Sequence, residues 1–255
     1  MFSKSQIASI LIAFFAVTTV NAHGVITAVK GGNGVTAQAF GVVETTPRDG
    51  TRRNPFQADS SIIRDKEIAS GDAQACGRTI GGGVNDMAAQ MEAASSAGLP
   101  SVGDDGSVTM TVHQVNGDGA GPYTCDVSTD ASGKNFVAME VTTNVPGENS
   151  RSKAKAEDFP LVAQMPAGAS CTGGPNGDAC VVRCRNAARA GPFGGCTAVT
   201  NAAPAGGNTT TTKREVTVAE AEEALMEDME KRSMVTEKKR YLRTRIAGAK
   251  AGYWI

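Results

Sequence analysis

The chain contains two histidines, His23 and His113, and their positions make them the first candidates for chemistry. His23 directly follows a predicted signal-peptide cleavage site, so its α-amino group and imidazole could bind one metal ion together. The imidazole of His113 would complete a three-nitrogen, T-shaped site. Because nitrogen ligands in tetragonal geometry favour copper, the sequence predicts a copper site. The alternative is that His113 is an ordinary strand residue with a hydrogen-bonded ring, and that His23 is terminal by coincidence.

Residues 1–22 have the features of a secretory signal peptide. Lys4 supplies a positive charge, residues 7–17 form a mostly apolar run, and Val20 and Ala22 place small residues at the cleavage site. The run is too short to cross a bilayer. We therefore expect a secreted, extracellular protein without a membrane span.

The six cysteines form an even set in a chain that is expected to be exported. An oxidising compartment favours three disulfides over a zinc site, and the chain has no Cys-x-x-Cys motif. Their spacing leaves the pairing open. The cysteines are Cys76, Cys125, Cys171, Cys180, Cys184 and Cys196.

The elements that must position the histidines are mainly β. Short runs of strand-type composition recur between turn clusters, which is typical of an immunoglobulin-like β-sandwich. In the clearest run, Ser107–Val115, apolar and polar residues alternate and His113 lies on the polar face. Asn116–Gly119 predicts a hairpin loop, and one helix is expected from Asn85 to Gly98. The other predicted strands are Gly24–Val29, Val35–Val43, Asn135–Thr143, Cys180–Cys184 and Cys196–Thr200.

Composition and charge divide the chain after the predicted sandwich domain at residues 23–200. A flexible linker is expected at 201–212, with Asn208 as an N-glycosylation acceptor. The tail at 213–255 is charged and is expected to be helical or disordered. Its three dibasic pairs indicate either a solvated amphipathic helix or sites of processing during secretion. The whole chain has 25 Lys and Arg against 26 Asp and Glu, so it lacks the basic excess typical of nucleic-acid binding.

Other catalytic signatures are weak. The chain has no Gly-x-Ser-x-Gly elbow, and its glycine-rich segments lack the ending of a phosphate-binding loop. A hydrolase that uses paired carboxylates stays open as an alternative, because several acidic residues lie near the predicted strands. They are Asp104, Asp105, Asp118, Asp126 and Glu140.

Several motifs, in order along residues 23–200, resemble the fungal Egh-like virulence factors. This resemblance implies a secreted, infection-related protein associated with appressoria or haustoria of plant- and insect-infecting fungi. The tail after Asn201 is not covered by it. The motifs are His23–Ile26, Thr46–Thr51, Cys76–Thr79, Thr111–Asn116, Asp118–Tyr123, Asn144–Gly147 and Ala190–Cys196.

A second, partial resemblance is to the histidine brace of lytic polysaccharide monooxygenases. It covers the two histidines and the cystine-stapled β-rich class, not motifs along the whole chain. In that family a reduced copper reacts with oxygen or peroxide and abstracts hydrogen from a glycan C–H bond, with a Tyr or Phe on the axial side. The resemblance implies Phe193 as the first axial candidate and Tyr123 as the second, although both could equally be core aromatics.

The resulting hypothesis is a secreted fungal infection protein that binds copper through His23 and His113, with oxidative cleavage of a polysaccharide left open. The alternative is a non-catalytic module for surface or host interaction, or for copper handling. We expect a monomer whose partner is a cell-wall polysaccharide or a host surface component. The scarcity of aromatic residues disfavours flat crystalline glycans and favours a softer wall polysaccharide.

Overall fold

The computed structural model describes residues 23–49 and 57–202. The predicted signal peptide at 1–22, Asn208 and the tail at 213–255 lie outside these residues, as does the linker from residue 203 onward. The helices are α1 (Asp65–Ser70) and α2 (Met87–Ala97), and Gly117–Gly119 forms a 3-10 turn. The strands are β1 (Gly24–Lys30), β2 (Thr36–Ala37), β3 (Ser61–Ile62), β4 (Arg78–Thr79), β5 (Gly83–Val84), β6 (Ser107–Gln114), β7 (Thr124–Ser128), β8 (Val137–Thr143), β9 (Glu157–Gln164), β10 (Ala179–Arg185) and β11 (Phe193–Thr200).

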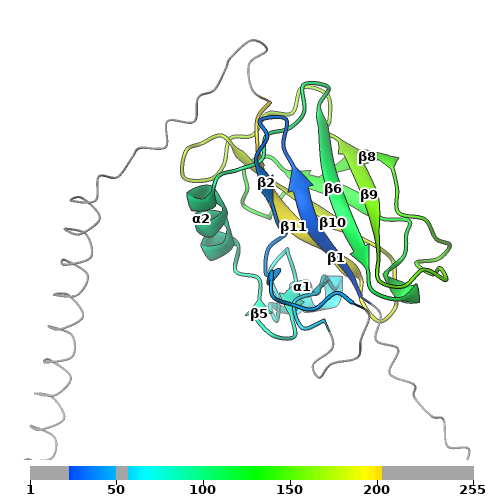
Figure 1. The fold of residues 1–255 in the computed structure, drawn as a ribbon. Coiled ribbons are helices and arrows are strands. Elements are labelled where there is room, and N and C mark those ends of the chain that lie inside the picture. The colour runs from blue at the N-terminus through cyan, green and yellow to red at the C-terminus, as the bar shows by residue number, and fades with distance from the viewer. Residues whose placement is uncertain (1–22, 50–56, 203–255) are drawn as a thin grey trace, which may run out of the picture. The chain divides into compact units, whose positions relative to one another are not determined.

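The strands of the described residues form one sheet that closes on itself (Figure 1). The order is β2-β1-β6-β9-β8-β7-β10-β11-β3-β4-β5, and β1 also pairs in parallel with β11 at Val25 and Gly194. Seven strands, from β1 round to β11, therefore make a closed barrel. Gly194 permits the close packing, because a Cβ there would lie 2.0 Å from the carbonyl oxygen of Cys184. The mainly β, disulfide-stapled class is confirmed, but the hydrogen bonding does not separate the strands into the two sheets of the predicted sandwich.

The predicted hairpin at Asn116–Gly119 is wrong. In the closed sheet β6 pairs with β1 and β9, whereas β7 pairs with β8 and β10. Gly119 is needed for close packing of two backbone segments and not for a tight turn. A Cβ on Gly119 would lie 2.1 Å from the carbonyl oxygen of His23. The predicted strand Val35–Val43 is also mostly loop, with only Thr36–Ala37 paired.

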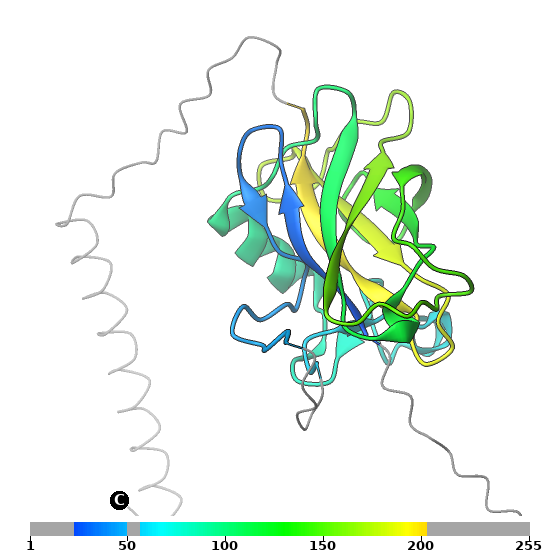
Figure 2. The ribbon, with the colours of Figure 1, turned by 45° about the vertical axis from the view of Figure 1, so that its right-hand side comes forward.

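Helix α2 lies on the outside of the barrel, and α1 and the short strands β3, β4 and β5 lie at the end where β1 begins (Figures 1 and 2). Asp86 caps α2 by accepting from the backbone N–H of Ala89, so the N-cap is one residue beyond the predicted Asn85. Met87 and Met91 pack the helix against β10 and β11. The barrel interior is filled by aliphatic side chains, among them Met110, Val112 and Leu161.

The three predicted disulfides are confirmed, and the structure supplies the pairing that the spacing left open. Cys76 pairs with Cys196, Cys125 with Cys184 and Cys171 with Cys180. The second bridge joins directly opposite residues of β7 and β10 inside the barrel. Within residues 23–49 and 57–202, no helix has the length and apolar content needed to cross a bilayer.

Candidate metal centre

Strand register places His23 and His113 on the same face of the β1–β6 ladder. Val25 lies opposite His113, and the N–H of Val115 donates to the carbonyl of His23 over 3.0 Å. His23 and His113 are thus diagonal neighbours, a relation that typically separates α-carbons by about 7–8 Å. They lie on the outer face, because the alternate residues of β6, Met110 and Val112, fill the core. Both histidines are nevertheless buried, at 4% and 6% exposed.

The ring of His113 is oriented by an acidic residue of the neighbouring strand. Asp158 of β9 lies directly opposite His113, and its Oδ1 is 2.6 Å from Nδ1 of the imidazole. The network assigns the Nδ1 proton to this bond, because a carboxylate can only accept. Nε2 is buried and has no hydrogen-bond partner among the described residues. In the neutral imidazole, Nε2 then carries the lone pair and is the nitrogen suited to bind a metal.

Both backbone polar groups of His23 are held in place. Its N–H donates to Oδ1 of Asn116 over 3.0 Å, and its carbonyl continues the ladder to Val115. The imidazole packs against the ring of Phe193, with ring centroids 5.1 Å apart. The structure therefore brings together His23 and the first axial candidate.

Tyr123, the second axial candidate, belongs to the core of the barrel. Its ring is 2% exposed, and its hydroxyl donates to the carbonyl of Gly119 over 2.9 Å. Burial raises the pKa of this phenol above its ordinary value. The hydroxyl lies against Gly24, where a Cβ would approach it within 2.1 Å. Tyr123 thus supports the backbone next to His23 from the inner side.

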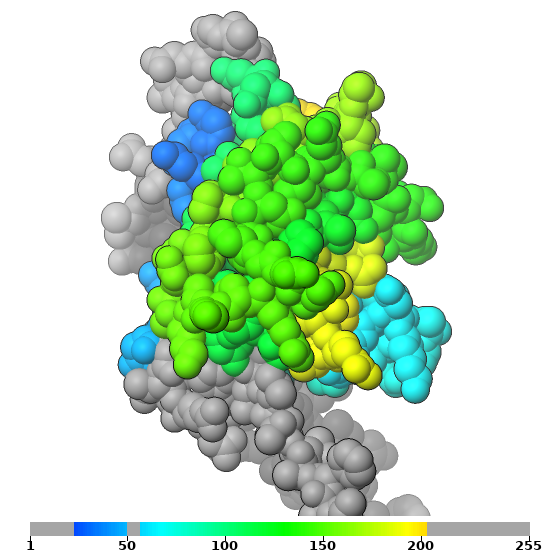
Figure 3. All heavy atoms as spheres, turned by 90° about the vertical axis from the view of Figure 1, so that its right-hand side faces the viewer, coloured from blue at the N-terminus to red at the C-terminus, as the bar shows by residue number. Residues whose placement is uncertain are grey.

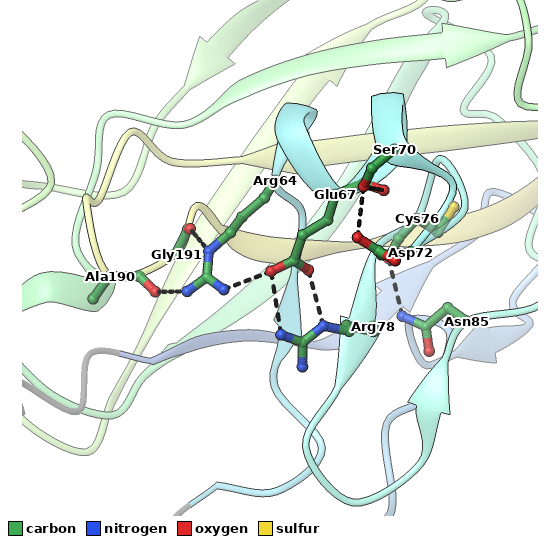
Figure 4. Close-up of polar contacts among 9 residues, drawn as sticks. All are labelled: Arg64, Glu67, Ser70, Asp72, Cys76, Arg78, Asn85, Ala190 and Gly191. Atoms are coloured by element: carbon green, nitrogen blue, oxygen red, sulfur yellow. Dashed lines mark hydrogen bonds and ion pairs between the residues drawn. The ribbon is translucent and has the colours of Figure 1, made fainter.

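An ion-pair network holds the loop that precedes Phe193. The carboxylate of Glu67 accepts from both Arg64 and Arg78, and Arg64 also donates to the carbonyls of Ala190 and Gly191 (Figure 4). The hydrogen bond from Arg78, followed by that from Arg64, holds the pKa of Glu67 below its ordinary value. Helix α1 is thereby fastened to the segment that leads into β11.

The side chains of this face by themselves do not make up a three-ligand metal site. Among the described residues, no group of three or more His, Cys, Asp or Glu side chains could hold a metal ion. The histidine brace expected from the sequence would not need such a group, since the nitrogen of His23 would be the third donor beside the two imidazoles. The buried Nε2 of His113 is suited to be one of these donors. The strand register, which puts both histidines on one face, is compatible with such a ligand set.

Three of the carboxylates considered for a hydrolase, Asp105, Asp118 and Asp126, have other partners. Asp126 forms an ion pair with Arg183, with their closest atoms 2.5 Å apart. Asp105 accepts from Ser107, and this hydrogen bond holds its pKa below the ordinary value. A glycosidase acid needs a raised pKa, so this arrangement at Asp105 does not suit that role.

Two residues of the centre have no distinctive signal in the sequence. The turn composition of Asn116–Gly119 predicts only a loop role for Asn116, and Asp158 is one of many acidic residues. The strand of Asp158 contains Pro160, which lacks a backbone donor and is unusual within a strand, so the sequence gives a weak strand signal there. Its pairing with a residue 45 positions earlier is set by strand register, which leaves no local signal.

Comparison with known proteins points to one family. The family model of the Egh16-like virulence factors matches residues 21–194. The appressoria-specific virulence factor GAS1 of Pyricularia oryzae is 47% identical over 201 residues, which cover 76% of this chain and 77% of that protein. The appressoria-specific virulence factor GAS2 of the same fungus is 37% identical, covering 75% of this chain and 88% of that protein. No solved structure matches the chain.

Proposed function

Because this chain belongs to the Egh16-like virulence factor family, we propose that it is a secreted fungal infection protein that binds one copper ion through His23 and His113. Three disulfides within the domain support export, since such bridges persist in oxidising compartments. Removal of residues 1–22 would turn the nitrogen of His23 into an amine and complete the ligand set.

The observation that carries the copper proposal is the state of the His113 ring. Its Nδ1 is engaged by Asp158, and its Nε2 is buried without a partner among the described residues. A buried polar atom without a hydrogen-bond partner costs free energy, so binding of a ligand to that atom would be favourable. A copper ion on Nε2 would supply one.

Each residue of the centre has a defined task in this proposal. His23 and His113 supply the nitrogens, Asp158 orients the second imidazole, and Asn116 positions the first residue. Phe193 packs on the ring of His23 and limits water on that side. Bound copper would supply one-electron redox chemistry with oxygen or peroxide, and the substrate would be a wall polysaccharide.

One observation favours a second candidate function, a binding module without catalysis. Ile80 and Val84 are 50% and 43% exposed on the short β4–β5 hairpin, where an apolar contact with a host or wall component could form. A measurement of redox activity distinguishes the enzyme from the binding module. Oxidised oligosaccharides released only with copper and a reductant support the enzyme, whereas copper binding with no product from a broad glycan panel supports the module.

The test uses the chain exported by a fungal host. N-terminal sequencing should return His23, and copper titration with electron paramagnetic resonance should show nitrogen coordination and one ion per chain. A matched variant with one alanine inserted before His23 keeps every side chain but removes the terminal histidine amine. Equal copper affinity and identical spectra for the two proteins would overturn the proposal.

A further inference from the structure

A cavity of about 780 Å³ lies beside the candidate metal centre and has no part in holding copper. Two loop segments form its walls, Glu148–Lys153 and Ala187–Ala190, and Asp118 of the 3-10 turn contributes to the lining. In Figure 3 the green middle part of the chain borders yellow atoms from the region of β10 and β11 on one face. This cavity is a candidate binding feature separate from the proposed copper ligands.

Buried amides hold both walls in place. Gln114, fully buried at the end of β6, donates through Nε2 to Oγ of Ser152 over 2.7 Å and to the carbonyl of Ala154 over 3.0 Å. Asn186, 3% exposed, donates to the carbonyls of Asp118 and Ala120. The cavity is therefore a preorganised part of the fold, so a ligand would lose little affinity to loop ordering.

The cavity is more basic than the domain around it. Residues 23–200 contain 14 Lys and Arg against 18 Asp and Glu, a net charge of −4. The lining instead contains Arg151, Lys153 and Arg189 against Asp118 and Glu148, a net charge of +1. Asp118 lies 3.5 Å from Arg151. Among the described residues, no carboxylate forms an ion pair with Lys153 or Arg189, so these two cations are available to an anionic ligand.

The mixture of charges indicates which anion would fit. Arginine and lysine bind carboxylates well, and arginine can do so through two parallel hydrogen bonds. The carboxylates of Asp118 and Glu148 would repel closely spaced phosphates but can accept hydrogen bonds from sugar hydroxyls. No aromatic residue lines the cavity within the described residues, so base stacking has no platform. A sugar polymer with carboxylates at intervals matches this lining better than a nucleic acid.

Residues of the cavity wall contact neighbours of both proposed copper ligands. Ala188 packs with Phe193, whose ring contacts His23. On the other wall, Gln114 directly follows His113, and the basic segment continues through Lys155 towards Asp158. The cavity wall is thus linked by direct contacts to Phe193, which packs on His23, and to the residue that follows His113.

We propose that this cavity binds an acidic polysaccharide built of uronic acid units. As a statement about substrate it rests on the proposed function, but as a binding site it does not require copper. Binding is therefore measured on metal-free, full-length exported protein by affinity electrophoresis and calorimetry, and copper binding is measured separately on the same samples.

The choice of polymers tests whether the cavity recognises the carboxylates of the ligand. Polygalacturonate should bind, whereas its fully methyl-esterified form, with the same backbone and no charge, should bind at least about tenfold more weakly. Equal binding of the two forms would overturn the proposal, as would absence of binding to polygalacturonate. Double-stranded DNA serves as a phosphate polyanion, and binding of DNA as tight as that of polygalacturonate would also overturn it.

A pair of double variants tests whether binding takes place in the cavity. The double variant Lys153→Gln, Arg189→Gln should lose at least about tenfold in affinity for polygalacturonate. The control Lys66→Gln, Lys134→Gln removes the same charge from exposed positions outside the lining and should bind like the wild type. Thermal melting of both variants checks the fold. Equal affinity of both variants would overturn the proposal, whereas loss of copper binding alone would overturn only the copper function.

Discussion

His113 and Asp158 face each other directly across β6 and β9, with Nδ1 of the ring 2.6 Å from the carboxylate oxygen. Asp158 is 64% exposed while the ring it holds is buried, so the carboxylate orients the ring from the solvent side. This cross-strand pair decides which imidazole nitrogen faces the candidate metal centre.

Asp158→Asn should weaken copper binding about 10- to 100-fold and alter the copper spectrum, because the partner that orients the imidazole is lost. Copper titration and electron paramagnetic resonance measure both effects. Glu157→Gln is the matched control, since it removes the same charge from the adjacent exposed residue. If Asp158→Asn and Glu157→Gln bind copper alike, Asp158 has no orienting role.

Asn116→Ala should lower the free energy of unfolding by about 1 kcal/mol, because the hydrogen bond to the nitrogen of His23 disappears. It should also weaken copper binding. Asn116→Asp keeps an acceptor oxygen and should retain most of the affinity. Urea unfolding and copper titration provide the two measurements, and identical behaviour of the alanine and aspartate variants would contradict the role assigned to Asn116.

Removal of Cys76–Cys196 should destabilise the domain more than removal of Cys171–Cys180. The first bridge closes 120 residues and the second closes 9, and the chain-entropy account then gives a difference of roughly 2 kcal/mol. The measurement is denaturant unfolding of the two paired Cys→Ala variants. Equal losses would show that local packing outweighs loop length here.

Glu67→Gln should reduce stability at neutral pH and have less effect in acid. The pKa of Glu67 is held below its ordinary value of 4.5, so the folded state binds fewer protons than the unfolded state. The stabilisation is therefore present above about pH 4.5 and is lost as the pH falls through the lower folded pKa. Unfolding of wild type and variant at pH 3 and pH 7 tests this, with Glu92→Gln on exposed α2 as the control. A stability difference independent of pH would contradict it.

Sequence patterns predicted those parts of the fold that have a local cause. The alternation over Ser107–Val115 identified β6 and the face of His113, and the even cysteine number identified three bridges. Strand closure between Val25 and Gly194 joins residues far apart in the chain and has no periodic signature. Pairing across such contacts is the reason why the structure is a closed sheet and not the predicted sandwich.

The same limit applies to the candidate site. His23 and His113 stand out because they are the two histidines of the chain. Asp158 has many acidic competitors, and Pro160 conceals its strand. This proline is tolerated because β8 pairs only with residues 162–164 of β9, so no ladder bond to β8 is needed at position 160.

The neighbours His113 and Gln114 point to opposite sides of β6, one towards the candidate metal centre and the other towards the loop that bears the basic residues. A slip of the strand by a single position would exchange imidazole and amide, because side chains alternate along a strand. Mispairing would thus disable the metal ligand and the loop anchor in the same event, and a chain that folds with the correct alignment obtains both together.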